Sequence, residues 1–314
     1  MRYLDKAWDV VVAGELYTDL IMSGFDFWPQ PGREAFAKEF HREIGGGAAI
    51  TACGLAKLGT RAALLGLVGV DGDWLLDHLQ RSRVDTSQIQ TNPAEPTAFT
   101  VAVTAPGDRA FLTYPGANRG FPAALAEAAA GKLLTGARHV HLAFAPELET
   151  ASALFLAIRG NGCTLSLDVG WHEDWLADPR ALDALRWIDI FFPNEIEAAR
   201  LTGETDPEPC LKKLAAAGMK RVALKLGPRG AALLWDGKIL FDAPPEVTPV
   251  DTTGAGDCFD AGLLHTWLKG ASPEKLLRAG NICGACSTEA YGGISGFPSA
   301  ARLGRELKAN PCEE

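Results

Sequence analysis

The sequence predicts an α/β fold with a doubly wound, mostly parallel sheet flanked by helices. Two observations predict it. Short apolar or β-branched runs alternate with Ala/Leu-rich segments of helical spacing. No linker long or polar enough to separate independent domains interrupts the chain, so we expect a single domain over 1–314. Right-handed crossovers then place helices on both faces of the sheet.

The elements follow from these runs in chain order. The predicted strands are 9–13, 62–68, 139–144, 164–168, 189–192 and 221–226. The clearest helical patterns are 48–59, 214–220 and 276–289. Cys283 and Cys286 form a CxxC pair inside the last of these, and we expect both to pack within the helix.

One region departs from the alternation. Segments 97–104 and 109–114 flank an Ala-Pro-Gly-Asp turn and predict a β-hairpin. A second strand pair is indicated between Leu16 and Phe40. We expect these excursions, at about 15–43 and 94–116, to form a small β-sheet lid over the main sheet. The alternative is a surface hairpin without function.

The alternation of Phe99, Val101 and Val103 within the hairpin gives it one apolar face. That face is expected to cover a ligand and exclude water.

Composition excludes several classes of function. The formal net charge of −9 disfavours nucleic acid or an anionic membrane as partner. The apolar runs fall far short of the roughly 20 residues of a membrane span. The first residues lack the apolar stretch of a signal peptide, and seven cysteines, an odd number, fit free thiols. We therefore expect a cytoplasmic protein that acts on a small molecule.

The segment Asp-Thr-Thr-Gly-Ala-Gly-Asp (251–257) is the most informative motif. Its glycines precede an amphipathic helix, so successive amide groups can form an anion-binding nest at a helix N-terminus. Asp257 falls in the first turn, where a carboxylate can accept the proton of an attacking hydroxyl. The alternative is that Asp257 only complements the helix dipole.

The stretch 251–264 resembles the carboxyl-terminal signature of the ribokinase-like (pfkB) carbohydrate kinase family, and the resemblance extends over nearly the whole chain. It implies an ATP-dependent, magnesium-requiring kinase with a β-sheet lid over the sugar. Asp257 resembles the catalytic base. Gly254, Ala255 and Gly256 resemble the anion hole. Asp251 and Thr253 are similar to residues that hold K⁺ in some members.

Further stretches follow the family order. The segment 14–20 resembles the first-strand motif, in which Asp19 binds sugar hydroxyls, and 44–59 resembles the amino-terminal signature, with Gly46 and Gly47 beside the substrate. The segment 193–203 contains the NxxE motif. The residues that the resemblance places near ATP are Asn194, Lys225, Gly227, Gly230, Gly256 and Asn281, and Glu197 is placed near magnesium through water.

One position departs from the family pattern. Ile50 stands where the amino-terminal signature usually has Asn, so specificity for ribose or fructose does not carry over. The expected reaction transfers the γ-phosphoryl group of ATP to a hydroxyl, a primary one, of a small sugar or sugar derivative. The alternatives are a nucleoside kinase of the same family and a non-catalytic binding protein. A homodimer formed through the lid is a further expectation.

Overall fold

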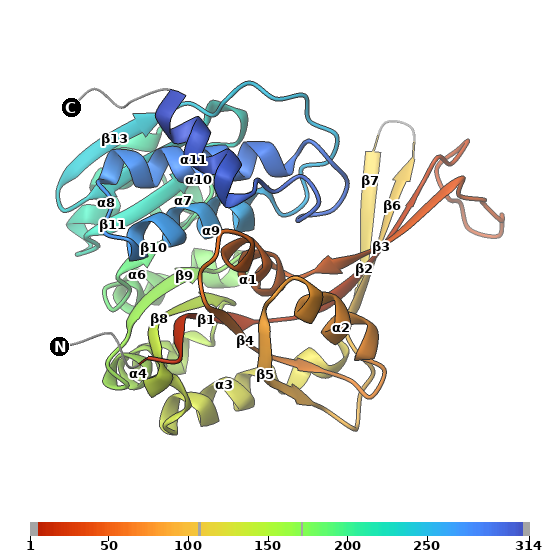
Figure 1. Cartoon of the computed structure of the whole chain (residues 1–314), viewed down its shortest axis with the longest axis horizontal. Helices are drawn as coiled ribbons and strands as arrows, with labels where there is room; N and C mark the ends of the chain where they lie inside the picture. The colour runs from red at the N-terminus through yellow and green to blue at the C-terminus, as the bar shows by residue number, and fades with distance from the viewer. Residues whose placement is uncertain (1–5, 106–107, 171, 310–314) are drawn as a thin grey trace.

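The computed structural model describes residues 6–105, 108–170 and 172–309, and these form two β-sheets with helices packed on the larger one (Figure 1). The Pro-Gly pair expected to turn the lid hairpin, 106–107, lies outside the described residues. No helix in the described part of the chain is both long and apolar enough to cross a membrane. Six cysteines there are buried free thiols, and Cys283 and Cys286 lie in a helix as expected.

Nine strands of the described residues form the main sheet, in the order β13-β12-β11-β10-β9-β8-β1-β4-β5. The strands from β5 to β11 run parallel, and β12 and β13 are antiparallel. This confirms the doubly wound, mostly parallel sheet. Its strands are β1 (Trp8–Gly14), β4 (Ala62–Val68), β5 (Asp85–Thr91), β8 (Ala137–Ala143), β9 (Thr164–Asp168), β10 (Ile190–Phe191), β11 (Arg221–Lys225), β12 (Ala231–Trp235) and β13 (Lys238–Asp242).

Three of these strands were not predicted. The edge strand β5 is mostly polar, so it lacks an apolar run. The β12–β13 hairpin carried a signal that could have found it, because Asp236 and Gly237 both adopt positive φ, 46° and 91°, between two short strands. Asp-Gly at this spacing is typical of a two-residue hairpin turn.

Helices cover both faces of the sheet. One face packs against α3 to α8 and the other against α1, α2 and α9 to α11. The helices are α1 (Gly47–Lys57), α2 (Asp73–Arg81), α3 (Phe121–Ala130), α4 (Leu148–Gly160), α5 (Glu173–Ala177), α6 (Arg180–Leu185), α7 (Glu195–Thr202), α8 (Pro207–Ala216), α9 (Ala255–Leu268), α10 (Pro273–Ser287) and α11 (Ala300–Ala309), with 3₁₀ turns η2 (Gly116–Gly120), η3 (Leu133–Gly136) and η4 (Gly227–Arg229).

The second sheet, here called the lid sheet, projects from one side of the molecule, at the right of Figure 1. Its strands are β2 (Tyr17–Ser23), β3 (Glu39–Gly45), β6 (Phe99–Ala105) and β7 (Asp108–Tyr114), in the order β3-β2-β6-β7. The neighbours β2 and β6 are parallel, although they come from the two separate excursions. Both predicted excursions therefore contribute to one small sheet.

The register of the lid sheet corrects one expectation about its faces. Asp19 pairs with Thr100, so these two side chains share a face. Phe99, Val101 and Val103 alternate as predicted but lie on the opposite face, where Val103 packs with Phe25. The strand register thus turns these three residues away from Asp19, so they and the predicted substrate-binding carboxylate cannot face the same ligand.

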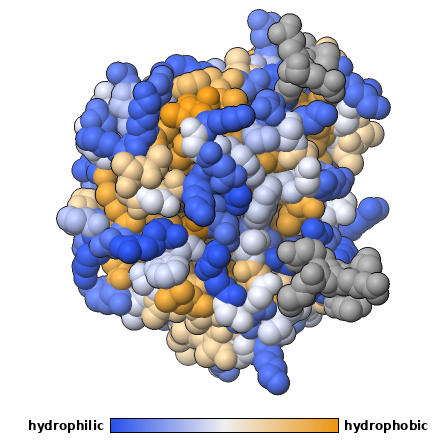
Figure 2. All heavy atoms as spheres, turned by 90° about the vertical axis from the view of Figure 1, so that its left-hand side faces the viewer, coloured by the Kyte–Doolittle hydropathy of each residue, from blue (hydrophilic) through white to orange (hydrophobic). Residues whose placement is uncertain are grey.

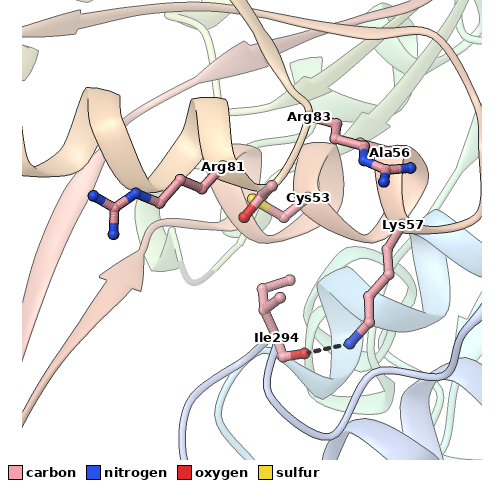
Figure 3. A pocket seen from close by; sticks show the side chains of 7 residues that line it. Cys53, Ala56, Lys57, Arg81, Arg83 and Ile294 are labelled. Atoms are coloured by element: carbon pink, nitrogen blue, oxygen red, sulfur yellow. Dashed lines mark hydrogen bonds between the residues drawn. The ribbon is translucent and has the colours of Figure 1, made fainter.

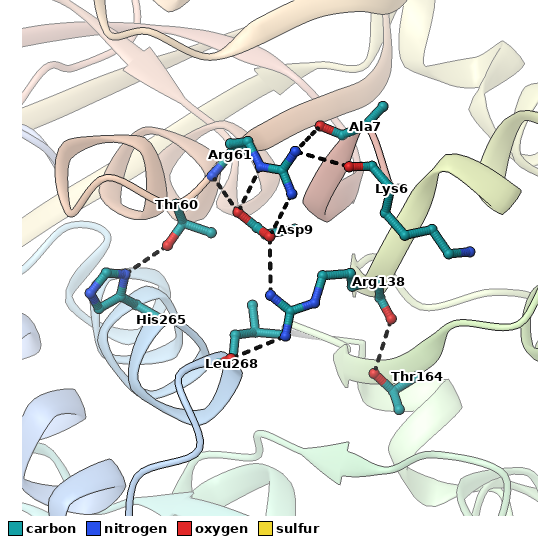
Figure 4. A network of polar contacts seen from close by, with 9 residues as sticks. All are labelled: Lys6, Ala7, Asp9, Thr60, Arg61, Arg138, Thr164, His265 and Leu268. Atoms are coloured by element: carbon teal, nitrogen blue, oxygen red, sulfur yellow. Dashed lines mark hydrogen bonds and ion pairs between the residues drawn. The ribbon is translucent and has the colours of Figure 1, made fainter. Parts of the chain in front are cut away.

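A polar network anchors the far end of α9 to the starts of the strands (Figure 4). Asp9 accepts hydrogen bonds from the Arg61 guanidinium (3.0 and 3.2 Å) and from Arg138 (3.1 Å). Arg138 also donates to the main-chain oxygen of Leu268, the last residue of α9, at 3.2 Å. A cation at this position complements the C-terminal end of the helix. The network thus fixes the helix that begins at the 251–257 motif.

We predict that Asp9→Asn lowers the free energy of unfolding by about 1–3 kcal/mol at neutral pH, because Arg138 loses a charged partner. Burial opposes ionisation of Asp9, but the hydrogen bonds from Arg61 and Arg138 outweigh it and hold the pKa below its usual value. A carboxyl group whose pKa is lower in the folded than in the unfolded protein stabilises the fold at pH values above its unfolded pKa. This stabilisation is lost as the pH falls through the folded pKa. The difference between the two proteins should therefore shrink below about pH 4.

Urea unfolding at several pH values measures this difference. Asp77→Asn is the matched control, since Asp77 forms an exposed ion pair with Arg81 that is worth little. Equal losses in the two variants would contradict an anchoring role for Asp9.

Candidate active site

Two helix N-termini meet at the carboxyl group of Asp257. Helix α9 starts after Gly254 (φ 71°), and Asp257 lies in its first turn. Helix α1 starts after Gly46 (φ 88°), and a Cβ atom on Gly47 would lie 2.5 Å from Asp257 Oδ1. The Thr51 hydroxyl donates to the main-chain oxygen of Asp257 at 3.2 Å. The first turns of both helices, whose amide groups have no partner within their helices, therefore lie close to this carboxyl.

The pKa of the Asp257 carboxyl group lies close to neutral pH. Burial raises its pKa, the nearby charge of Asp168 raises it further, and Lys225 opposes both, with a value of about 7 as the result. Both protonation states of the carboxyl are therefore accessible at ordinary pH.

Lys225 lies beside the same helix start. Its Nζ atom is 2.6 Å from Asp168 Oδ2 and 3.4 Å from Asp260 Oδ1. A Cβ atom on Gly256 would lie 3.4 Å from this nitrogen. Burial acts to lower the pKa of Lys225, but Asp168 and Asp260 outweigh it and raise the pKa, so the side chain is a fixed cation. The positive charge is thus held next to the 254–256 amides.

A buried chain of polar side chains continues behind Lys225. Ser166 Oγ lies 2.7 Å from both His139 Nε2 and His141 Nδ1, and all three residues are fully buried. His141 Nε2 lies 3.9 Å from Asp260 Oδ2. Burial lowers the pKa of both histidines. The two histidines are hydrogen-bonded packing residues, and the described residues gather no metal-binding cluster of three His, Cys, Asp or Glu.

Asp19 lies on the opposite side of this region, on lid strand β2, with a half-buried side chain. A Cβ atom on Gly45 would lie 2.1 Å from Asp19 Oδ1, so only glycine leaves room for this carboxyl. Burial raises the pKa of Asp19, and Asp251 and Glu43 raise it further, to about 6. Asp19 therefore lies close to other carboxylates.

The 251–254 segment is tied to the loop after α10. Asp251 Oδ1 accepts hydrogen bonds from the amide (3.0 Å) and hydroxyl (2.8 Å) of Thr253. Asp251 Oδ2 accepts from the Gly292 amide at 3.0 Å. These bonds fix the turn that leads into Gly254.

Asn194 and Glu197 form a capping box at the start of α7. Asn194 Oδ1 accepts from the Glu197 amide at 2.9 Å, and the Glu197 carboxylate accepts from the Asn194 amide (2.8 Å) and side chain (2.7 Å). This is the helix-cap arrangement that Asn and Glu favour at this spacing. Burial, with Asp168 nearby, raises the pKa of Glu197 to about 7. An isolated bridge between Asn194 and Lys225 keeps the motif beside the site.

The remaining predicted nucleotide residues divide into two groups. Gly227 (φ 58°) is open, with no atom near its missing side chain. Gly230 packs on β13, where a Cβ atom would lie 2.1 Å from the Asp242 main-chain oxygen. Asn281 donates to the same oxygen and to the Asp242 carboxylate, both at 2.8 Å. Gly230 and Asn281 thus have structural roles that their sequence signals did not indicate.

Ile50, the departure from the family pattern, is 3% exposed. Its side chain fills the space beside two glycines, where Cβ atoms on Gly254 and Gly293 would lie 2.9 and 2.8 Å from Ile50 Cδ1. An apolar side chain therefore packs under the start of α9.

A cavity of about 320 Å³ at the other end of α1 lies apart from these residues (Figure 3). Its lining includes Cys53, Lys57 and Ile294, and Lys57 Nζ donates to the Ile294 oxygen at 3.3 Å. None of the residues predicted for the site lines this cavity.

The structure thus brings together Asp257, Gly47, Lys225 and the 254–256 turn, with Asp19 and Asp251 on the lid side. Sequence reasoning missed Gly45 and Asp260. Gly45 belongs to a run of three glycines, and Asp260 follows Asp257 by three residues on one face of α9, so both signals were present.

We predict that Gly47→Ala displaces the Asp257 carboxyl and lowers stability by about 1–3 kcal/mol through overpacking. Gly160→Ala is the matched control, because Gly160 ends α4 and open space surrounds its missing side chain. Urea unfolding and a crystal structure of each variant measure the two effects. An unmoved Asp257 in Gly47→Ala would contradict the close contact.

Comparison with known proteins gives consistent matches. The family model for pfkB family carbohydrate kinases matches residues 8–300. A 2-dehydro-3-deoxygluconokinase of Bacillus subtilis (strain 168) is 28% identical over 285 residues, covering 86% of this chain and 88% of the relative. An ATP-dependent ribose-1-phosphate kinase of Halopiger xanaduensis is 31% identical over 290 residues, covering 91% of this chain and 94% of the relative.

The fold has solved counterparts. The structure of Arabidopsis thaliana ribokinase complexed with ribose and ATP matches with a TM-score of 0.84 at 27% identity, covering 96% of this chain and 99% of that one. The family model matches nearly the whole chain and the solved ribokinase shares its fold, so the chain belongs to the pfkB family of carbohydrate kinases.

Proposed function

We propose that this carbohydrate kinase transfers the γ-phosphoryl group of ATP to a primary hydroxyl of a small sugar or sugar derivative, with Asp257 as the general base. One observation carries the proposal: a carboxyl with a pKa of about 7 lies where the N-termini of α1 and α9 meet. A base with a pKa near the working pH accepts a proton efficiently in the transition state.

The phosphoryl side of the site is assigned to the turn that opens α9. The amides of Gly254, Ala255 and Gly256 donate to the oxygens of the transferred group, and the helix dipole adds to their effect. The Lys225 ammonium, beside Gly256, offsets the charge that develops there. Asp168 and Asp260 hold the ammonium in place.

ATP and Mg²⁺ are assigned to the sheet edge beyond Lys225. Mg²⁺ typically binds phosphate oxygens and waters with one or two carboxylates, and when bound it neutralises phosphate charge. Glu197 fits this chemistry through water, because its carboxylate oxygens already accept hydrogen bonds from Asn194. The open turn at Gly227 accommodates the nucleotide, and Gly230 and Asn281 shape its outer wall through Asp242.

The acceptor is assigned to the space between the lid sheet and the 45–47 glycines. The Asp19 carboxylate accepts hydrogen bonds from sugar hydroxyls, and Gly46 and Gly47 let the sugar approach the backbone. A monovalent cation such as K⁺ is assigned to Asp251 and Thr253, because a carboxylate and a hydroxyl oxygen lie side by side there.

A second copy of this chain is the proposed partner of the lid sheet. Phe40, Phe99 and Leu112 lie on the face opposite Asp19 and are exposed by 57%, 36% and 61%. On the side of the molecule away from the lid, apolar and hydrophilic residues intermingle (Figure 2). The lid sheet therefore offers the better apolar surface for a homodimer.

We predict that Asp257→Asn lowers kcat by about 10²–10⁴-fold and leaves the KM for ATP nearly unchanged, because the base acts on the acceptor hydroxyl only in the transition state. Asp73→Asn is the matched control, since Asp73 is an acidic residue in the first turn of α2, remote from the site motifs in sequence. Steady-state kinetics with ATP and a saturating acceptor distinguish the effect of Asp257→Asn from that of Asp73→Asn.

The pH profile gives a second measurement of the same role. The base must be ionised, so wild-type kcat/KM should fall about tenfold for each pH unit below the raised pKa near 7. The pH profile of Asp257→Asn should lack this fall in kcat/KM at low pH. Wild-type turnover in Asp257→Asn, or a loss equal to that of Asp73→Asn, would rule out the base.

We predict that Glu197→Gln raises the Mg²⁺ concentration needed for half-maximal rate and lowers kcat, because the carboxylate orients the water shell of the metal. Glu195→Gln is the control, since Glu195 is an exposed residue of the same first turn paired with Arg229. Magnesium titration of the rate is the measurement. An unchanged requirement in Glu197→Gln would leave Glu197 as a helix cap only.

A further inference from the structure

Two carboxylates lie directly opposite each other on the lid sheet. Asp19 of β2 pairs with Glu43 of β3 in the antiparallel register, so their side chains share one face. Glu43 also reaches the loop after α10, because a Cβ atom on Gly292 would lie 3.1 Å from Glu43 Oε2. The Gly292 amide is the group that donates to Asp251. Glu43 therefore lies on the acceptor side of the site, next to Asp19 and Asp251.

This arrangement is unfavourable for the protein alone. Like charges directly opposite each other on neighbouring strands are destabilising. Neither the Asp19 side chain nor the Glu43 side chain forms a hydrogen bond or an ion pair with another described residue. Burial raises the pKa of Glu43, and Asp251 adds to this effect while His41 and His78 oppose it.

The neighbouring basic side chains are engaged elsewhere. Arg42 points to the other face, where its guanidinium lies 4.1 Å from the centre of the Trp74 ring. His41 shares the face of Glu43, but its ring stacks on Tyr291 with centroids 5.2 Å apart. No hydrogen bond or ion pair with another described residue accounts for the pair of carboxylates, whereas a ligand rich in hydroxyl donors does, since ionised carboxylates only accept hydrogen bonds.

We infer that Glu43, together with Asp19, selects a neutral polyhydroxy acceptor and rejects acceptors that carry a carboxylate or a phosphate near the recognised hydroxyls. The inference rests on the acceptor site proposed above and names its substrate class. Hydroxyl groups donate to both carboxylates, whereas an anionic acceptor meets like charge and leaves both carboxylates without donors. Among the relatives' named substrates, it favours the neutral sugar over the sugar acid and the sugar phosphate.

The experiment compares kcat/KM for four acceptors: a neutral aldose, a neutral ketose, a 2-keto-3-deoxy sugar acid and a sugar 1-phosphate. The proteins are wild type, Glu43→Gln and Glu39→Gln. The last is the matched control, because Glu39 lies on the same strand and face but at its exposed outer end, opposite Ser23. Acceptor binding to each protein is measured in parallel by calorimetry without ATP, and thermal unfolding checks that each variant is folded.

The wild type should prefer the neutral acceptors. Glu43→Gln should raise kcat/KM for the sugar acid by about tenfold relative to the neutral sugars, as expected for removal of one like charge in a partly solvated pocket. Glu39→Gln should leave the ratio unchanged. A wild type that prefers an anionic acceptor overturns the inference and leaves the kinase function intact, and so does an identical ratio in wild type and Glu43→Gln.

Absence of turnover with every acceptor counts against the proposed reaction and not against the selectivity. In that case the calorimetry decides: binding of neutral sugars but not of the acid supports the inference. Equal or stronger binding of the acid overturns it.

Discussion

The close approach of α1 and α9 is the contact on which the site depends. It requires small residues at successive levels of the interface. Gly47 leaves room for the Asp257 carboxyl, and a Cβ atom on Gly54, two turns along α1, would lie 2.8 Å from the Cβ of Ala261. Larger side chains at these positions would separate the helices, and their first turns would no longer point at the same place. Gly47 and Gly54 are therefore packing requirements of this interface.

This geometry concentrates negative charge in one place. Asp19 and Asp257 both have raised pKa values, to about 6 and 7, because burial and neighbouring carboxylates disfavour ionisation. Lys225 is the nearby cation that opposes this effect at Asp257. Such an arrangement costs stability in the free protein, and perturbed carboxyl groups of this kind are common where function requires them. Polyol hydroxyls, a metal ion and a monovalent cation are the groups that would relieve it.

The sequence predicted the alternating strands, the two lid excursions and the place of Asp257 in the first turn of a helix, because each depends on local patterns. It did not predict the parallel pairing of β2 with β6, which joins distant segments, or the face of the hairpin, which depends on register. The hydrogen bonds of Asn281 to Asp242 likewise involve residues far apart in the chain. The cross-strand pair of Asp19 and Glu43 could be recognised only once the register was known. Local motifs therefore predicted the elements and where their special residues lie, whereas the tertiary contacts determined which side chains engage one another.

The parallel pairing of β2 and β6 also has a consequence during synthesis. The hydrogen bond from the Thr18 amide to the Ala98 oxygen joins residues separated by β3, α1, β4, α2 and β5. The β2–β3 hairpin therefore emerges from the ribosome with one edge of β2 unpaired until β6 follows. An open strand edge invites pairing with another nascent chain, and charged side chains are a common protection against it. Asp19, Glu39 and Glu43 place three carboxylates on that hairpin.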